Sequence, residues 1–276
     1  MYDLHVHTTA SDGLLTPAEV IELAIEIGLT GIAITDHDTM NGLVSAAEYL
    51  KSKQLSLDFI PGIEINTDVE AGEVHILGYY VNADDQRLRS RLEEIKSCRW
   101  ERAVGMIEKL VGLGLPITVE EVEKQAKGDL IGRPHIAMAL KDRCYVESIK
   151  EAFDKYIGQG RPAYVPRYKF PPEEAITLIH QAGGTAVLAH PGLIRNERTI
   201  SEIIDLGIDG IEAIYPEHDL KQVIYYKNIA DRDNLIITGG SDFHGIDSME
   251  SHSALGSCGI DDIIFKSIKQ KLLKNK

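Results

Sequence analysis

The fold is decided by residues 3–35, which read DLHVHTTASDGLLTPAEVIELAIEIGLTGIAIT. Two short apolar segments, Asp3–His7 and Gly31–Thr35, are typical of buried strands and flank a helical pattern. Thr16 and Glu19 form a capping-box pattern that marks the start of this helix. A strand, a helix and a second strand in immediate succession predict a unit of parallel β-sheet.

The same alternation continues over much of the chain. Five further strand-like segments occur, with helical patterns between them where the spacing permits. They are Phe59–Ile65, Glu73–Val81, Thr185–Ala189, Gly210–Ile214 and Leu235–Thr238. Regular alternation of strand and helix predicts a parallel sheet, either an α/β barrel or an open, doubly wound sheet.

The alternation is interrupted between the fourth and fifth strands. A long helical pattern over Arg87–Val111 precedes further short helical segments, which predicts an inserted helical lobe over residues 85–164. Residues 1–84 and 165–276 would then form the α/β domain. Residues 86–170 contain 17 lysine and arginine residues and 12 acidic residues, whereas the rest of the chain contains 12 and 31. We therefore expect a basic lobe beside an acidic domain.

Composition limits the class of protein. The 276 residues are 43% hydrophobic and 26% charged, which is typical of a globular protein and excludes a disordered or fibrous chain. The net charge of −14 argues against binding to duplex nucleic acid, because such binding depends on basic side chains that release counterions. Three cysteines without a C-x-x-C spacing indicate neither a disulfide framework nor a thiolate metal site. Without a secretory leader or a long apolar run, we expect a cytoplasmic protein that does not enter a membrane.

Side chains that can bind metal recur near the ends of the predicted strands. His5 and His7 are two residues apart, so a strand presents both imidazoles on one face. The full set is His5, His7, Asp12, His37, Glu64, His75, His190, Asp242 and His244. Imidazoles and carboxylates without a thiolate suit Zn²⁺, Mn²⁺ or Fe²⁺. Nine such groups are too many for one ion, so we expect two or three divalent ions at the barrel face where catalytic residues gather.

Seven motifs, in this order, resemble those of the polymerase and histidinol phosphatase (PHP) superfamily of metal-dependent phosphoesterases. They are Asp3-Leu4-His5-Val6-His7-Thr8, Ser11-Asp12-Gly13, Thr35-Asp36-His37-Asp38, Gly62-Ile63-Glu64-Ile65, Val74-His75-Ile76-Leu77-Gly78, Ala189-His190-Pro191 and Ser241-Asp242-Phe243-His244. The resemblance extends over nearly the whole chain. It implies a distorted seven-stranded (β/α) barrel, the PHP fold, with a trinuclear metal centre.

The resemblance also implies how the ligands are shared. One ion would be held by His5, His7, Glu64 and Asp242, a second by Asp12, His37 and His244, and a third by Glu64, His75 and His190. Several members of the superfamily have a histidine where this chain has Asp12, and the harder carboxylate ligand favours manganese over zinc or iron. His37, Asp242 and His244 would act in catalysis through a metal-activated hydroxide that attacks phosphorus.

Within the superfamily, the lobe and several shorter stretches resemble one bacterial subgroup. These stretches are Ile131–Ala137, Tyr164–Pro166 and Gly239–Gly245. The subgroup comprises nucleoside 3′,5′-bisphosphate phosphatases and 5′-3′ exoribonucleases that act on short RNA. We expect Gly239 and Gly240 to let the backbone turn before Asp242.

Candidate substrate contacts lie mainly in the lobe. Arg99 and Arg102 are three residues apart on one helix face, and guanidinium groups can bind phosphate bidentately. Arg133 and His135 form a second pair, and the resemblance places both pairs at the non-reacting phosphate of a nucleotide. His218 follows a predicted strand and is a further candidate contact. A solvated helix face is the alternative explanation for Arg99 and Arg102.

The favoured function is hydrolysis of nucleotide phosphate monoesters, above all the 3′-phosphate of nucleoside 3′,5′-bisphosphates, with activity on the 5′ ends of short RNA as an extension. The substrate would be a small phosphorylated molecule or short RNA, not duplex DNA. A histidinol-phosphate phosphatase, or another small-molecule phosphatase of the superfamily, is the alternative. A proofreading exonuclease fits the net charge poorly. A metal-binding interaction module without catalysis is the alternative of another class.

Overall fold

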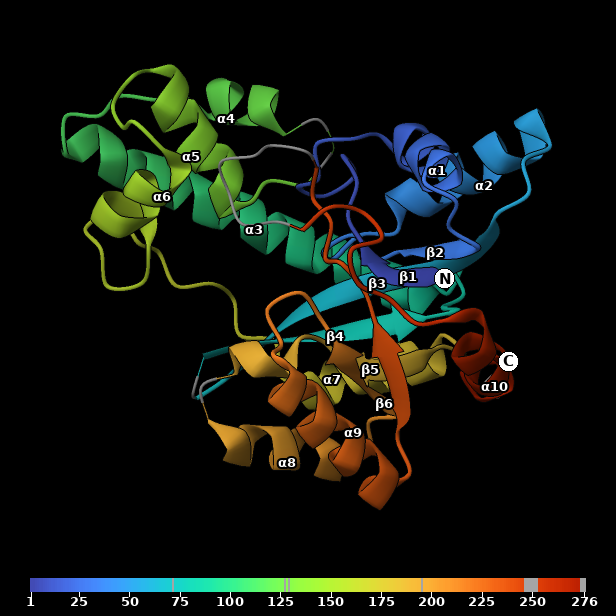
Figure 1. Cartoon of the computed structure of the whole chain (residues 1–276). Helices are drawn as coiled ribbons and strands as arrows, with labels where there is room; N and C mark the ends of the chain where they lie inside the picture. Colours follow the sequence, from blue (N-terminus) through green and yellow to red (C-terminus); the bar gives the residue numbers. More distant parts are fainter. Residues whose placement is uncertain (71, 127, 129, 195, 246–252, 274–276) are drawn as a thin grey trace.

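Seven strands form a single sheet in the computed structural model, which describes residues 1–276 except 71, 127, 129, 195, 246–252 and 274–276 (Figure 1). Strands that follow one another in sequence are neighbours in the sheet. They are β1 (Tyr2–Val6), β2 (Gly31–Ile34), β3 (Asp58–Val69), β4 (Gly72–Tyr79), β5 (Thr185–Leu188), β6 (Gly210–Ile214) and β7 (Ile236–Gly239). The seven predicted strands are all confirmed.

Strand β4 runs antiparallel to both β3 and β5, whereas the other neighbouring strands are parallel. In the β3–β4 hairpin, Gly62 pairs with Tyr79 and Val69 pairs with Gly72. Only two residues connect these strands, which is too short for the crossover that parallel strands require. The expectation of a parallel sheet therefore does not hold at β4, because no helix separates β3 from β4.

The sheet curls until its two edge strands meet. Val6 in β1 forms a parallel bridge with Phe243, which follows β7, and the amide of His7 donates to the carbonyl oxygen of Phe243 at 2.9 Å. The result is a nearly closed barrel rather than an open sheet. The carboxyl ends of its parallel strands lie at one mouth, where α/β barrels place their functional residues.

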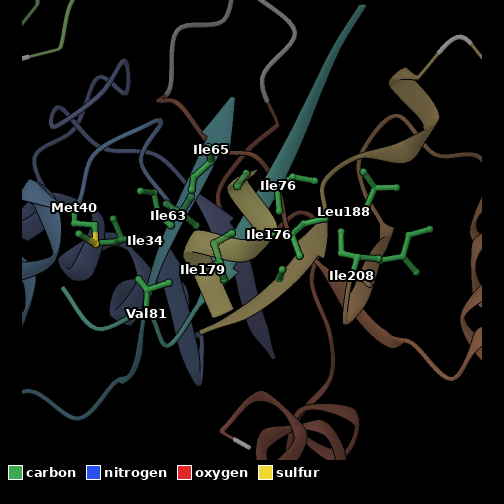
Figure 2. Close-up of a cluster of buried hydrophobic side chains, with 14 of the residues drawn as sticks. Ile34, Met40, Ile63, Ile65, Ile76, Val81, Ile176, Ile179, Leu188 and Ile208 are labelled. Carbon is green, nitrogen blue, oxygen red and sulfur yellow. The ribbon is translucent and has the colours of Figure 1, made fainter. Parts of the chain in front are cut away.

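Helices cover the outside of the barrel. They are α1 (Pro17–Glu26), α2 (Asn41–Lys53), α7 (Pro172–Gln181), α8 (Glu197–Asp205), α9 (Leu220–Asp233) and α10 (Asp262–Leu272), with a short 3₁₀ turn, η2 (Pro191–Leu193). The capping box of Thr16 and Glu19 begins α1, as predicted. Figure 2 shows Ile63 and Ile76 of the sheet in one buried cluster with Ile176 of α7. Among the described residues, no helix has the length and apolar character needed to cross a membrane.

The helices between β4 and α7 form their own group beside the barrel. They are α3 (Gln86–Gly112), α4 (Val119–Gln125), α5 (Arg133–Asp142), α6 (Ile149–Ala152) and a π-helical turn, η1 (Phe153–Ile157). Met106, Leu110 and Ile136 belong to a cluster of buried side chains drawn from this group alone. In Figure 1, α4, α5 and α6 gather on one side of the molecule and α3 runs from them toward the strands. The division of the chain at residues 85–164 stays a prediction.

Candidate metal centre

All nine predicted metal ligands lie together at the mouth of the barrel. His5 lies in β1, Glu64 in β3 and His75 in β4, and the other six follow the carboxyl ends of β1, β2, β5 and β7. The imidazole rings pack closely, with the ring centroid of His7 at 4.5 Å from that of His37 and 4.1 Å from that of His244. The barrel therefore brings together ligands that are far apart in the sequence.

The ligand atoms form three groups that could each hold an ion, with atoms within 4.8 Å of one another in each group. The groups are His5, His7, Glu64 and Asp242; His7, Asp12, His37 and His244; and His37, Glu64 and His75. The first group equals a set that the resemblance implies. The second adds His7 to an implied set. In the third, His37 appears where the resemblance implies His190, whose Nε2 lies 3.0 Å from Glu64 Oε1.

Glu64 lies at the centre of the cluster and is fully buried. Its Oε2 lies 3.2 Å from Nε2 of both His5 and His7, and 2.9 Å from Nδ1 of His37. Its Oε1 lies 2.9 Å from Nδ1 of His75 and 3.0 Å from Nε2 of His190. One carboxylate thus contacts imidazoles of every group, as a ligand that bridges neighbouring ions would.

Two ligands have unusual backbone geometry. Asp242 and His190 adopt φ angles of 54° and 26°, in the region that residues with a side chain rarely occupy. Such strained positions cluster at functional sites, because the surrounding structure must hold them there. In this geometry His190 Nε2 lies 3.0 Å from Glu64 Oε1, and Asp242 Oδ1 lies 3.0 Å from His7 Nε2.

The side chains present fit a cation. Six buried atoms of the cluster lie close to other ligand atoms but form no hydrogen bond of suitable geometry among the described residues: His5 Nε2, His7 Nδ1, His7 Nε2, Asp12 Oδ1, Glu64 Oε2 and Asp242 Oδ1. Buried polar atoms without partners are costly and therefore rare. Metal ions would satisfy these atoms together, and imidazole and carboxylate are suitable ligands for divalent transition metals.

The carboxylates and imidazoles shift one another's pKa values. Burial opposes a positive charge on His5, but the carboxylates of Asp242 and Glu212 raise its pKa well above the usual range. Burial also opposes a negative charge on Glu64, but the imidazoles of His37 and His5 hold its pKa well below the usual range. Protons bound to the imidazoles can therefore balance the negative charge of the carboxylates. A metal ion must displace these protons when it binds.

Residues around the ligands hold them in place. Glu212 in β6 is fully buried, and its carboxylate lies 3.0 Å from His5 Nδ1 and accepts the amide of His190 at 2.8 Å. The hydroxyl of Tyr215 donates to Asp242 Oδ2 at 3.0 Å. Sequence reasoning missed both residues. The signal for Glu212 was present, since it is the single charged residue in the otherwise apolar strand GIEAI.

Replacing Glu212 by glutamine should weaken the metal centre without removing a ligand. Outer partners of a metal-bound histidine orient its ring and raise its basicity, and their loss costs about 10- to 100-fold in metal affinity or activity. We expect a Glu212→Gln protein to retain less metal after dialysis and to need a higher metal concentration for full activity. Metal titration followed by elemental analysis measures this. Glu217→Gln, at an exposed position in the loop after the same strand, is the matched control, and equal metal affinity in the two variants would contradict the assignment.

A cavity of about 160 Å³ next to the metal ligands is lined by four arginines. They are Arg99 and Arg102 of α3, Arg133 at the start of α5, and Arg167, which sequence reasoning missed. Asp12, His37 and His75 line the same cavity. A bound anion could therefore contact the arginines while another part of the same molecule contacts the metal ligands.

The four arginines differ in their acidic partners. Nε of Arg99 donates to the buried Asp38 at 2.9 Å, and Nε of Arg167 donates to Asp68 at 2.6 Å. Nη2 of Arg133 lies 3.1 Å from Oε1 of Glu73. These three acids also escaped the sequence reasoning. The role of Arg99 in binding substrate stays a prediction, since Asp38 already engages its guanidinium group.

Arg102 has no carboxylate partner among the described residues. Its Nε donates to the carbonyl oxygen of Val165 at 2.8 Å, and its Nη2 is buried without a hydrogen bond. Burial and the neighbouring charge of Arg133 lower the pKa of Arg102 to about 10. Arg102 therefore remains charged at neutral pH, and no carboxylate of the described residues lies within ion-pair distance of it, although the charge of Glu73 acts on it from further away.

A second cavity, of about 370 Å³, opens on the same metal ligands but is mostly apolar. It shares Asp12, His37 and His75 with the arginine cavity. Its other walls include Leu14, Met138, Ile149 and Leu193, together with Lys141, and Phe153 lines both cavities. The metal ligands thus border both a cationic and an apolar cavity.

His135 and His218, two predicted substrate contacts, bind the backbone in the structure. Nδ1 of His135 accepts the amide of Gly132 at 3.0 Å and so caps α5. Nε2 of His218 accepts the amide of Gly192 at 3.0 Å, and its Nδ1 lies 3.0 Å from the carbonyl oxygen of Ala213. Both ring nitrogens of His218 are therefore engaged. Contact of either histidine with substrate stays a prediction.

An α/β barrel with imidazole and carboxylate ligands gathered at its mouth is typical of metal-dependent hydrolases. The family model described as the PHP domain matches residues 3–158. The chain belongs to the PHP domain family and is a metal-dependent phosphoesterase. The family resemblance seen in the sequence and the barrel fold that it implied are both confirmed.

Relatives match most of the chain. It is 34% identical over 249 residues to the 5′-3′ exoribonuclease Rnm of Escherichia coli strain K12, which covers 88% of this chain and 85% of the relative. It is 35% identical over 248 residues to a 3′,5′-nucleoside bisphosphate phosphatase of Chromobacterium violaceum, which covers 88% and 86%. The crystal structure of a metal-dependent phosphoesterase from Bifidobacterium adolescentis is 30% identical, with a TM-score of 0.87 over 99% of this chain and 96% of that one.

Proposed function

We propose that this protein hydrolyses the 3′-phosphate of nucleoside 3′,5′-bisphosphates. The observation that carries the proposal is Arg102, a buried cation without an acidic partner among the described residues, in a cavity that adjoins the metal ligands. A buried charge is costly unless it is paired, and phosphate is a strong partner for a guanidinium group. The names of the relatives, a bisphosphate phosphatase and an exoribonuclease, support the same substrate class.

The metal centre would contain two or three divalent ions, with manganese favoured over zinc or iron. The residues that would hold them are His5, His7, Asp12, His37, Glu64, His75, His190, Asp242 and His244. Bound ions supply Lewis acidity and an activated water for attack on phosphorus. Glu64 would lie between neighbouring ions, and Glu212 would keep the ring of His5 in the orientation for binding.

The division of labour between the two parts of the chain follows from these positions. Residues 1–84 and 165–276 would form the barrel and provide the metal ligands, and the lobe over residues 85–164 would provide most of the cationic cavity. Arg102 and Arg133 would bind the non-reacting 5′-phosphate. Binding of the 5′-phosphate by these arginines would position the 3′-phosphate at the metal ligands. Such orientation of the reacting group accounts for much of enzymatic rate enhancement.

A second activity, removal of nucleotides from the 5′ end of short RNA, is favoured by the apolar cavity. A phosphodiester has a further nucleoside beyond the reacting phosphate, and this group needs space on the side away from the arginines. Leu14, Met138 and Leu193 line such a space. Phe153 lines the same cavity and has an aromatic ring, the kind of side chain on which bases stack in proteins that bind single strands.

Substituting Arg102 by alanine tests the substrate. Loss of a hydrogen bond to a charged group costs about 1.5–3 kcal/mol, so we expect the KM for adenosine 3′,5′-bisphosphate to rise about 10- to 100-fold. The KM for adenosine 3′-monophosphate should change little, because that substrate has no second phosphate. Steady-state phosphate release with Mn²⁺ measures both constants. Arg89→Ala, an exposed arginine of the same helix, is the matched control.

The same assay separates the alternatives. A histidinol-phosphate phosphatase would prefer histidinol phosphate. In that case the Arg102→Ala substitution would change the KM for both adenosine substrates by the same factor. A metal-binding module without catalysis would release no phosphate from any of them. Hydrolysis of a 5′-phosphorylated dinucleotide by the wild-type protein would add the exoribonuclease activity.

A further inference from the structure

The arginine cavity contains an anion of the protein's own, the carboxylate of Glu73. This residue lies in β4, two positions before the metal ligand His75, at the end of the strand nearest the tip of the β3–β4 hairpin. Its Oε1 and Oε2 lie 3.1 Å and 3.4 Å from Nη2 of Arg133. The proposed function assigns the non-reacting phosphate to Arg102 and Arg133. In the structure, Glu73 already forms an ion pair with Arg133.

The acidic partners of the other arginines are held more firmly. The side chain of Asp38 is only 1% exposed, and besides Arg99 it accepts the backbone amide and the side-chain amide of Asn66, each at 2.9 Å. Asp68 is 18% exposed, and besides Arg167 it accepts the amide of Phe170. These two acids serve as fixed partners of their arginines.

Glu73 has fewer hydrogen-bond and ion-pair partners than Asp38 and Asp68. Its side chain is 40% exposed, and Arg133 is its only ion-pair partner within 4.0 Å among the described residues, although the charges of Arg167 and Arg102 also act on its carboxylate. An ion pair that reaches solvent contributes little, whereas charge-assisted bonds from arginine to phosphate are strong and frequently bidentate. A phosphate in this cavity can therefore replace the carboxylate of Glu73 on Arg133 at small cost.

The number of arginines without a fixed acidic partner favours this exchange. With Arg99 and Arg167 neutralised by fixed acids, Arg102 is the one cavity arginine without a carboxylate partner among the described residues. A terminal phosphate has close to two negative charges at neutral pH. We propose that Glu73 is a displaceable counter-ion that the non-reacting phosphate of the substrate must replace on Arg133. Glu73 then sets specificity, since a ligand without that phosphate leaves the pair intact.

This inference rests on the proposed function for the identity of the phosphate, and it predicts an effect opposite to that of losing an arginine. Glutamine at position 73 removes the competing charge but keeps the length of the side chain. We expect the Kd for adenosine 5′-monophosphate to fall about three- to tenfold in a Glu73→Gln protein, since an exposed carboxylate competes weakly. The Kd for adenosine should stay unchanged. Arg133→Ala should instead raise the Kd for the nucleotide.

Isothermal titration of the Mn²⁺-loaded full chain measures these constants. Glu70→Gln, at the exposed tip of the same hairpin, is the matched control for a change in net charge, and it should bind adenosine 5′-monophosphate as the wild type does. Equal or weaker binding of the nucleotide by Glu73→Gln would overturn the inference and leave Glu73 as an orienting partner of Arg133. The inference would also be overturned if Glu70→Gln tightened nucleotide binding as much as Glu73→Gln, since the effect would then come from net charge alone. Glu73→Ala repeats the measurement should the glutamine variant not fold.

The titration does not depend on turnover. If the wild-type protein releases no phosphate from any nucleotide, the proposed function fails, whereas tighter nucleotide binding by Glu73→Gln would still support the exchange. Where turnover is present, the ratio of KM for adenosine 3′-monophosphate to KM for the 3′,5′-bisphosphate should increase in Glu73→Gln. It should fall toward one in Arg133→Ala. A fall in both variants would contradict the exchange.

Discussion

A Glu64→Gln protein is expected to lose at least about a thousandfold of its phosphate-releasing activity, which corresponds to about 4 kcal/mol of transition-state stabilisation. The carboxylate of Glu64 contacts five imidazole nitrogens, at 2.9–3.2 Å. Glutamine has the same shape but no charge, and its nitrogen cannot act as a ligand. Bound ions would lose the shared negative charge that holds them close together, and charge stabilisation by metal ions supplies several kcal/mol in such enzymes.

The fold should survive this substitution, because the exchange is isosteric and the barrel core lies elsewhere. Phosphate release with saturating Mn²⁺, metal content per chain and circular dichroism measure the three quantities. Glu48→Gln, an exposed position of α2, is the matched control. A folded Glu64→Gln protein with wild-type metal content and wild-type rate would show that the cluster is not the catalytic metal centre.

A Gly240→Ala protein is expected to lose about 3 kcal/mol or more of its unfolding free energy, the upper part of the range for overpacked cores. A β-carbon at this position would lie 2.3 Å from the Cβ, 2.4 Å from the N and 2.8 Å from the Cα of His5. Two of these three atoms belong to the backbone of β1, which cannot move without opening the barrel. The same displacement would move the imidazole of His5, so metal affinity should fall as well.

Urea unfolding monitored by circular dichroism measures the loss, which should appear as a lower midpoint with little change in slope. Gly112→Ala is the matched control, since Gly112 ends α3 and nothing lies within 4 Å of its added β-carbon. Alanine has the higher helix propensity, so this control should stabilise by up to about 1 kcal/mol. Equal stability of Gly240→Ala and the wild type would mean that β1 and the segment after β7 do not approach as closely as described.

The expectation that Gly239 and Gly240 let the backbone turn before Asp242 was wrong. Neither glycine has a positive φ, so neither provides the turn before Asp242. Asp242 itself adopts the left-handed geometry, with a φ of 54°. Gly240 instead permits the close approach of β7 to β1, and Gly239 lies against Ile214 of β6, whose Cβ would be 2.6 Å from an added β-carbon. A glycine pair in a sequence indicates that there is no room for a side chain. It does not indicate which neighbouring residue fills that space.

The strands and long helices could be predicted because each depends on a local pattern. Gly210–Ile214 was predicted with the bounds that the structure has, and the long helix over Arg87–Val111 differs by one residue at each end. The direction of β4 could not be predicted from alternation, since it depends on the length of a connection that lies between two uncertain strand ends. A two-residue link allows only an antiparallel partner.

The candidate metal ligands could be predicted for a related reason. Most of the ligands lie near or after the carboxyl end of a parallel strand, so strand order places them at one mouth. His75 is the exception, since it lies within β4, which runs antiparallel to its neighbours. The arginine cavity had no such rule. Arg167 lies outside any helix or strand, and Glu73 meets Arg133 only because the β3–β4 hairpin reaches the lobe.

The sequence by itself determined the seven strands and the nine candidate ligands, from periodicity and from ligand types near strand ends, and the resemblance of its motifs to the PHP superfamily implied the family and the barrel. Only the tertiary structure decided which arginines are already paired, that Glu212 and Tyr215 support the ligands, and that an apolar cavity borders the same centre. The physical reason is that charge compensation and cavity shape depend on distances of a few ångströms between segments far apart in the chain. No local pattern encodes such distances.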